Sequence, residues 1–559
     1  MDKPVRILAL PILFVLWVLA LLELTGFFLA GFLHRMHPER IGPLDVVFWW
    51  IENAASPLAT ERLLRSLECA ASVALGLPCL VAFAPEIGRM LERFRGGAEN
   101  KLHGEARWAR AREIRGAGLL GMAGIVLGKK QGRTLFFDGQ GRGKNVLIAA
   151  PPGSGKTAGI MLPNCLSWPQ SLVALDIKGE CCALTAAYRE SLGQKVVRLN
   201  FSARDGRTDQ YNPFAYVSED PDLRVGDIEK IARYLCPDPA RGDAFWAMSA
   251  REMFRALALY LFDAGKPVTL GAIRDLLETE EGLRRFAKEV LRDRKAEGEK
   301  VITARVARDF AIMANRSDAT HSGIVDQLMT ALAPFANPLL RRATAENSFD
   351  LRDLRKDPVS IYLIVARPDL PALRPLLNLF VQQLVDLNTL VEFGKDPEHK
   401  SEVLLAMDEF AQVGRLDAIF EGITYFRSFG LRLLAIVQSP AQLKEIYSFE
   451  AAEAFEQSFD CRVYFTPAAS DIGTAETVSR LLGTNTVSGR SRSIRLGSSR
   501  SSSSVTQSEK GRPLLLPQEV LRLPLEKEIV LIGGVAPILA DKIRVWKESV
   551  FAQRMDAAP

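Results

Sequence analysis

Hydrophobic residues form two long runs near the N-terminus of the chain. The run at residues 7–33 has Glu23 as its only charged residue, and it exceeds the roughly 20 apolar residues that a helix needs to cross a bilayer core. The run at 63–84 is weaker because Arg65 lies near its start. It predicts a second span if this side chain extends to the interface, and otherwise a buried helix of a soluble domain. We predict that residues 1–88 are a membrane anchor.

Basic residues flank the anchor on both sides. Lys3 and Arg6 precede the first run, and Arg89 and Arg93 follow the second, whereas the loop between the runs balances acidic and basic residues. By the positive-inside rule, both ends of the anchor are expected in the cytoplasm. We therefore predict a multi-pass membrane protein with the bulk of its chain cytoplasmic.

Short apolar runs of strand type follow the anchor, and helical stretches separate most of them. Several are apolar throughout, as expected for strands that are covered on both faces. This alternation predicts an α/β domain with a mostly parallel sheet. The runs lie at residues 145–149, 171–176, 196–199, 359–365, 403–407, 433–437, 462–465 and 528–532.

A helical segment interrupts this pattern. Apolar residues from Phe245 to Leu261 recur near the 3.6-residue period, and no convincing strand is evident nearby. We predict a separate all-α domain at 225–345, inserted between two parts of the α/β domain at 89–224 and 346–559. Composition adds little: the net charge of +5 neither requires nor excludes nucleic acid. Seven Cys without a C-x-x-C pair argue against a disulfide scaffold or a zinc ribbon.

A glycine-rich turn follows the strand at 145–149. Its sequence matches G-x-x-x-x-G-K-[ST] except that Ala150 replaces the first Gly. Lys156 is expected to reach the β- and γ-phosphates of a nucleotide, and Thr157 to place its hydroxyl on Mg²⁺. The helix that follows, from about Lys156, adds a positive N-terminal dipole. The residues expected to cradle the nucleotide are Pro152, Gly153, Ser154, Gly155, Lys156 and Thr157.

An acidic pair, Asp408 and Glu409, ends the apolar run at 403–407. The first carboxylate is expected to hold Mg²⁺ and the second to orient the attacking water. Gln438, at the end of another strand, is either a sensor of the γ-phosphate or a structural residue. Together with Lys156, the pair predicts nucleotide hydrolysis with Mg²⁺.

A segment rich in Ser and Arg lies at residues 488–504, and it contains four Arg and no acidic residue. A flexible basic loop is suited to tracking a phosphate backbone, which would make DNA binding salt-sensitive. An unstructured connection between strands is the alternative.

In five stretches the sequence resembles the coupling proteins of type IV secretion systems, the TraG/VirD type of conjugative DNA transfer ATPase. They are APPGSGKT at 150–157, LDIKGE at 175–180, MDEFAQVGRLD at 407–417, RSFGLRLLAIVQSPAQLKEIY at 427–447 and RPLLLPQEVLRLP at 512–524. The resemblance implies that the nucleotide is ATP and that the protein is a RecA-like ATPase of the bacterial inner membrane, which forms a ring expected to be a homo-hexamer. It also implies that the protein receives a relaxase–DNA complex or secreted effectors and passes them to the channel components of the secretion system.

The resemblance further implies roles for individual residues. Arg427 is expected to be an arginine finger that acts on a neighbouring subunit, with Arg432 as the competing candidate; such a residue raises the rate roughly 10³–10⁵-fold. Asp176, Lys178 and Glu180 are expected close to the nucleotide. Two other functions stay open: a DNA translocase of the FtsK/HerA class, and a substrate receptor in which nucleotide only holds the ring together.

Overall fold

The computed structural model describes residues 103–139, 143–239, 243–279, 282–297, 302–494 and 503–556, together with parts of 51–71. The chain divides into two compact units at 1–101 and 102–559, so the boundary falls 13 residues beyond the predicted end of the anchor at residue 88. The predicted span at 7–33 lies outside the described residues, and only the helical start of the 63–84 run is described. No helix in the described part of the chain has the length and apolar character to cross a bilayer.

An 11-stranded sheet organises the unit at 102–559, in the order β2-β1-β13-β12-β9-β3-β8-β7-β4-β6-β5. The seven strands from β9 to β5 are parallel, and four antiparallel strands extend one edge. This confirms the predicted α/β fold with a mostly parallel sheet. The bounds are β1 Ile125–Lys130, β2 Arg133–Phe137, β3 Val146–Ala149, β4 Ser171–Asp176, β5 Lys195–Asn200, β6 Val359–Ile364, β7 Val403–Met407, β8 Leu431–Val437, β9 Cys461–Phe465, β12 Lys527–Ile532 and β13 Ile538–Asp541.

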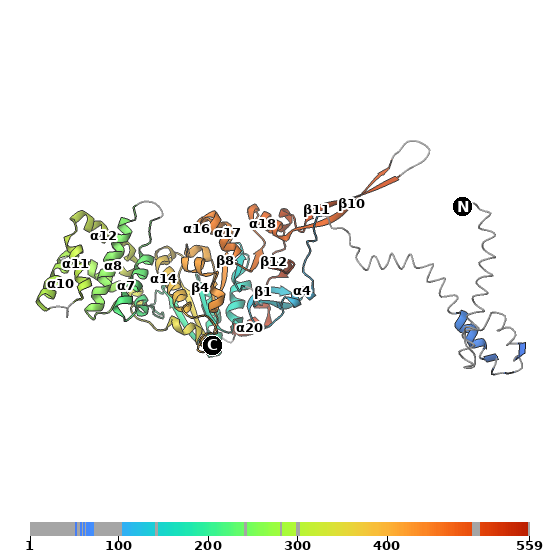
Figure 1. Ribbon diagram of the computed structural model, residues 1–559, viewed down its shortest axis with the longest axis horizontal. Coiled ribbons are helices and arrows are strands. Elements are labelled where there is room, and N and C mark those ends of the chain that lie inside the picture. Colours follow the sequence, from blue (N-terminus) through green and yellow to red (C-terminus); the bar gives the residue numbers. More distant parts are fainter. Residues whose placement is uncertain are drawn as a thin grey trace. The chain divides into compact units, whose positions relative to one another are not determined.

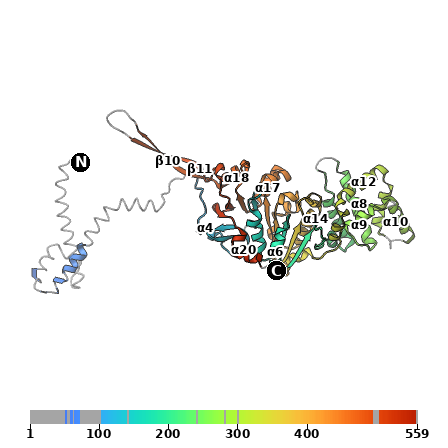
Figure 2. The ribbon, with the colours of Figure 1, turned by 180° about the vertical axis from the view of Figure 1, so that it is seen from behind.

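Helices cover both faces of this sheet, which explains why its central strands are apolar throughout. Within β3, Leu147 and Ala149 join one hydrophobic core, whereas Val146 and Ile148 join the other, because successive side chains point to opposite faces. Figure 2 labels helices from both layers. The first core includes α14 Leu370–Asn388, α16 Ala441–Ile446, α17 Phe449–Gln457 and α18 Ile472–Leu482; the second includes α5 Leu162–Ser167, α6 Glu180–Ser191 and α20 Ser549–Asp556.

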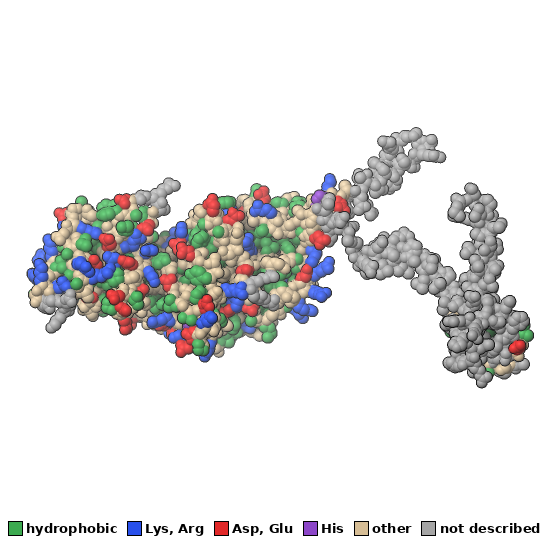
Figure 3. Space-filling model, in the orientation of Figure 1, with side chains coloured by type: hydrophobic (Ala, Val, Ile, Leu, Met, Phe, Trp, Pro, Cys, Tyr) green, Lys and Arg blue, Asp and Glu red, His purple; other side chains and the backbone are tan. Residues whose placement is uncertain are grey.

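The segment between β5 and β6 is helical, and its described residues from 221 to 343 contain no strand. Its principal helices gather at one end of the unit, away from β10 and β11 (Figure 1). Acidic and basic side chains are interspersed over its visible face (Figure 3). This segment has a hydrophobic core that is continuous with that of the sheet. It comprises α7 Pro221–Leu235, α8 Phe245–Asp263, α9 Leu270–Leu277, α10 Leu283–Glu297, α11 Ala304–Asn315, α12 Asp318–Ala331 and α13 Pro338–Ala343.

The predicted loop at 488–504 overlaps the two strands of a β-hairpin at its ends, and residues 495–502 lie outside the described residues. Strands β10 Thr484–Ile494 and β11 Ser503–Pro513 pair in antiparallel register along their whole length. The pairing rests on backbone hydrogen bonds, which any non-proline residue can form. The sequence of these strands is rich in Ser and has no alternating apolar pattern, so it contains no signal of them.

Candidate nucleotide site

The glycine-rich turn joins β3 to the following helix at the carboxyl edge of the parallel strands. Gly153 and Gly155 have φ of 72° and 84°, a conformation that side chains with a Cβ rarely adopt. Ala150 does not have positive φ, and its N–H donates to the carbonyl of Val437 at 2.9 Å. The alanine at the first consensus position is therefore compatible with the turn.

The helix predicted from about Lys156 follows this turn, but its first turn is wider than an α-helical one. It begins with one π-helical turn, Thr157–Met161, and continues as α5. Pro163, at the start of α5, has no N–H to donate to a carbonyl of the preceding turn. The wider turn lies between the lysine and threonine of the motif and this proline, and it accommodates the missing N–H.

The structure brings the glycine-rich turn and the acidic pair together. The ammonium Nζ of Lys156 lies 3.3 Å from Oδ1 of Asp408 and 3.0 Å from Oε1 of Glu409. The hydroxyl of Thr157 donates to Oδ2 of Asp408 at 3.4 Å. These groups meet because β7 and β3, which lie on either side of β8, end at the same edge of the sheet.

Burial disfavours the charged form of the carboxyl groups in this cluster. It raises the pKa of Asp408 above the ordinary value, although the nearby Lys156 acts in the opposite direction. Burial likewise raises the pKa of Asp176, and the charge of Asp408 adds to that effect. Oδ1 of Asp408 is buried, and its partner among the described residues is the ammonium of Lys156 at 3.3 Å. A carboxylate beside a hydroxyl is a donor set that suits Mg²⁺, so these residues fit that ion.

Glu409 has an unusual backbone conformation and a partner that sequence reasoning missed. Its φ of 56° is in the left-handed region, which few non-glycine residues adopt outside functional sites. Its Oε2 lies 2.9 Å from the guanidinium of Arg367, on the loop after β6. The sequence around Arg367 contains no motif that marks it.

The other predicted residues lie at varied distances from this cluster. Gln438 directly follows β8, the strand between β3 and β7, so its backbone lies at the carboxyl edge between the glycine-rich turn and the acidic pair. Asp176 ends β4, and its carboxylate accepts a hydrogen bond from the N–H of Cys182 at 2.8 Å. Lys178 and Glu180 are more exposed. They form an ion pair, in which Nζ of Lys178 lies 3.9 Å from Oε1 of Glu180.

The two arginines proposed as fingers differ in their surroundings. Arg432 is 3% exposed and forms ion pairs with Asp138 and Glu402, so it cannot reach a neighbouring subunit. Arg427 is exposed on the short helix before β8. It lies at the amino edge of the sheet, one strand length from Lys156, and is therefore remote from the nucleotide site of its own chain.

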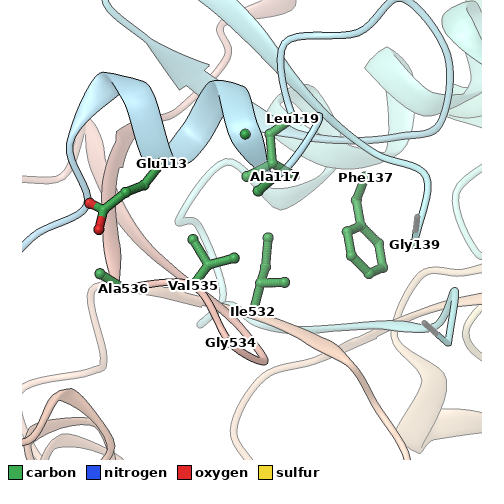
Figure 4. Close-up of a pocket in the computed structure, with 10 residues that line it drawn as sticks. Glu113, Ala117, Leu119, Phe137, Gly139, Ile532, Gly534, Val535 and Ala536 are labelled. Carbon is green, nitrogen blue, oxygen red and sulfur yellow. The ribbon is translucent and has the colours of Figure 1, made fainter. Parts of the chain in front are cut away.

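A cavity of about 310 Å³ lies at the same amino edge. Figure 4 shows the side chains of Leu119, Phe137, Ile532 and Val535 facing its interior. The carboxylate of Glu113 is paired with Arg107 at 2.6 Å. The residues that line this cavity are separate from the cluster around Lys156.

Residues 107–558 match the family model for type IV secretory system conjugative DNA transfer. Protein VirD4 of Agrobacterium fabrum (strain C58 / ATCC 33970) is 29% identical over 525 residues, which cover 92% of this chain and 75% of the relative. The conjugal transfer protein TraG of Escherichia coli is 28% identical over 539 residues, or 87% of this chain and 83% of the relative.

Solved structures of a bacterial conjugative coupling protein share the fold. Unbound TrwBdeltaN70 aligns with a TM-score of 0.55 and 20% identity over 79% of this chain and 94% of that chain. TrwB in complex with ADP and Mg²⁺ aligns with the same TM-score at 19% identity, over 78% of this chain and 92% of that chain.

Proposed function

The chain belongs to the type IV secretory system conjugative DNA transfer family, and on that premise we propose that it is the ATP-hydrolysing coupling protein of such a system. It binds Mg²⁺ and ATP at the carboxyl edge of the sheet. The energy of hydrolysis drives a relaxase–DNA complex, or secreted effectors, into the secretion channel. The TrwB complex with ADP and Mg²⁺ supports the choice of ligands.

One observation carries this proposal: Lys156 lies 3.0 Å from Glu409, although 253 positions separate them in the chain. A buried ammonium between two carboxylates, next to a glycine-rich turn whose N–H groups can face phosphates, fits nucleotide hydrolysis. In a purely structural ion pair, the hydroxyl of Thr157, which donates to the carboxylate of Asp408, would have no role.

Each residue has a defined part in the reaction. With a triphosphate bound, Lys156 leaves the acidic pair and neutralises the β- and γ-phosphates. Thr157 and Asp408 hold Mg²⁺, which supplies further positive charge against the phosphate oxygens. Glu409, released by Lys156, orients the attacking water and accepts its proton. Gln438 contacts the γ-phosphate from the end of β8.

A neighbouring subunit completes the site. Arg427 is exposed and remote from Lys156 of its own chain, which suits a residue that acts on an adjacent nucleotide. Such a residue requires a ring, and a homo-hexamer is the form we propose. We also propose that residues 7–33 and 63–84 anchor this ring in the bacterial inner membrane, and that the ring binds DNA.

Substrate transfer in cells tests the proposal. We expect Glu409→Gln to retain ATP binding, to abolish ATP turnover and to stop transfer of DNA between cells. The exposed Glu445 on α16 provides a matched control, and Glu445→Gln should leave transfer unchanged. Normal transfer by Glu409→Gln would contradict a motor and would favour a receptor in which nucleotide only stabilises the ring.

A further inference from the structure

We infer that Arg367 is a positioning residue for ATP hydrolysis, which holds the carboxylate of Glu409 in place after Lys156 has turned to the phosphates. The inference rests on the proposed function, because it assigns a task within the same site. It concerns a residue that belongs to none of the sequence motifs.

Glu409 is held from two sides. Its Oε1 lies 3.0 Å from Nζ of Lys156, and its Oε2 accepts a hydrogen bond from the guanidinium of Arg367 at 2.9 Å. A bound triphosphate competes for the first of these cations but leaves the second in place. Among the described ion pairs of Glu409, the contact with Arg367 is then the one that remains.

The backbone that carries Arg367 is fixed. The N–H of Ala366 donates to the hydroxyl of Ser202 at 3.0 Å. The carbonyl of Ala366 accepts from the N–H groups of Asp369 and Leu370, at the start of α14. The guanidinium therefore reaches Glu409 from an anchored position.

Helix α14 also forms hydrogen bonds to the loop that follows Glu409. Arg374 donates to the carbonyl of Gln412 at 3.0 Å, and the amide of Asn378 donates to the carbonyl of Arg415 at 2.9 Å. These contacts fix the backbone of the loop, but they do not touch the reacting carboxylate. Arg367 is the member of this set that acts on the side chain of Glu409 itself.

The backbone of Glu409 makes such a restraint useful. A non-glycine residue in the left-handed region is strained, so its side chain leaves the chain in a direction set by the loop. A general base needs a third group that orients it towards the proton it takes, and misplacement by about 1 Å can cost 10²-fold in rate. Arg367 meets this need through its contact with Oε2 of Glu409.

The pair does not serve folding stability to any large extent. The side chain of Arg367 is 63% exposed whereas that of Glu409 is 11% exposed. Ion pairs with an exposed partner add little to stability, because water and salt screen them. An effect of Arg367 on the rate would therefore be separable from an effect on folding.

The test compares three variants of the full-length protein. We expect Arg367→Ala to lower kcat for ATP about 10- to 100-fold while the Kd for ATP and the Tm stay close to wild type. Arg367→Lys should restore part of the rate, because an ammonium can still pair with Glu409. Arg352→Ala is the matched control: Arg352 is also exposed and pairs with Asp350 at 2.7 Å, and its loss should leave kcat unchanged.

Three results would overturn the inference. An unchanged kcat would make Arg367 a surface residue, and a raised kcat would make it a restraint that blocks Glu409. A Kd for ATP weakened by the same factor as kcat/KM would mean that Arg367 binds nucleotide directly. Failure of the proposed function has a different signature, since wild type and Glu409→Gln would then show the same rate of ATP turnover.

Discussion

Arg432 and Arg427 provide a test of which arginine acts in ATP turnover, because their environments differ. Arg432 lies within β8, whereas Arg427 lies on the short helix before this strand. Arg432 is buried in the sheet, and its guanidinium lies 2.7 Å from Oδ1 of Asp138 and also pairs with Glu402. It stacks over the ring of Trp168 at 4.9 Å. We predict that Arg432→Ala destabilises the protein, whereas Arg427→Ala abolishes turnover without destabilising it.

The magnitude follows from what each variant leaves behind. Removing one partner of a buried ion pair costs about 3–5 kcal/mol. In the variant, Glu402 still has an ion-pair partner, because Nζ of Lys144 lies 2.6 Å from its Oε1. This remaining pair favours the lower end of the range, or ~3 kcal/mol. The unit at 102–559 has an unfolding entropy of about 1 kcal/mol/K at typical values per residue, so the Tm should fall by ~3 °C. Loss of the exposed Arg427 should cost less than about 0.5 kcal/mol.

Thermal unfolding and ATP turnover are measured on the same preparations. For Arg427, we also mix Arg427→Ala with Lys156→Ala, each inactive alone. If Arg427 acts on a neighbour, mixed rings contain sites with a wild-type lysine from one subunit and a wild-type arginine from the other. Turnover should then reappear on mixing.

Two results would refute this reasoning. The first is an unchanged Tm for Arg432→Ala together with lost turnover, which would make Arg432 the catalytic arginine. The second is mixtures that stay inactive although both variants assemble with each other, which would deny Arg427 a role across the subunit interface.

Two further predictions follow from other parts of the unit. Burial raises the pKa of Glu528 to about 8, so its folded state holds the proton more tightly than the unfolded state and stability falls as pH rises from about 4.5 to 8. Between pH 5 and pH 7 the free energy of unfolding of the wild type should fall by about 2–3 kcal/mol, whereas that of Glu528→Gln should not. Denaturant unfolding measures this free energy, and an equal dependence on pH in the two proteins would contradict the prediction. Deletion of residues 488–504 should weaken DNA binding and reduce its salt slope by up to about four, one for each lost arginine–phosphate contact; an unchanged slope in a salt titration would exclude the hairpin from binding.

The central strands could be predicted because strands that are buried on both faces are apolar throughout. β4 Ser171–Asp176 and β7 Val403–Met407 have the predicted bounds, and both are buried along their length. At the antiparallel edge, β12 Lys527–Ile532 matches the run predicted at 528–532, but β1, β2 and β13 were missed: β1 contains Gly128 and ends in two lysines, and β13 has only four residues. Short or polar edge strands have no distinctive periodicity.

The candidate site was predictable as far as its residues lie at strand ends. Parallel strands end at a common edge, so Lys156 and Asp408 were expected to meet, and they lie 3.3 Å apart. Arg367 was not predictable, because its role depends on the path of a loop that no local pattern determines. The burial of Arg432 was equally hidden, since it results from the contacts of Glu402 and Asp138.

The most direct test asks whether a triphosphate binds between the glycine-rich turn and the acidic pair. It measures equilibrium binding of ATP with Mg²⁺, alongside ATP turnover, for wild type, Lys156→Ala and Glu409→Gln. We expect Glu409→Gln to bind ATP as tightly as wild type within about threefold but to lose at least about 10²-fold in turnover, the scale of misplaced or absent catalytic groups. Lys156→Ala should lose binding as well. Wild-type binding by Lys156→Ala, or wild-type turnover by Glu409→Gln, would contradict the account.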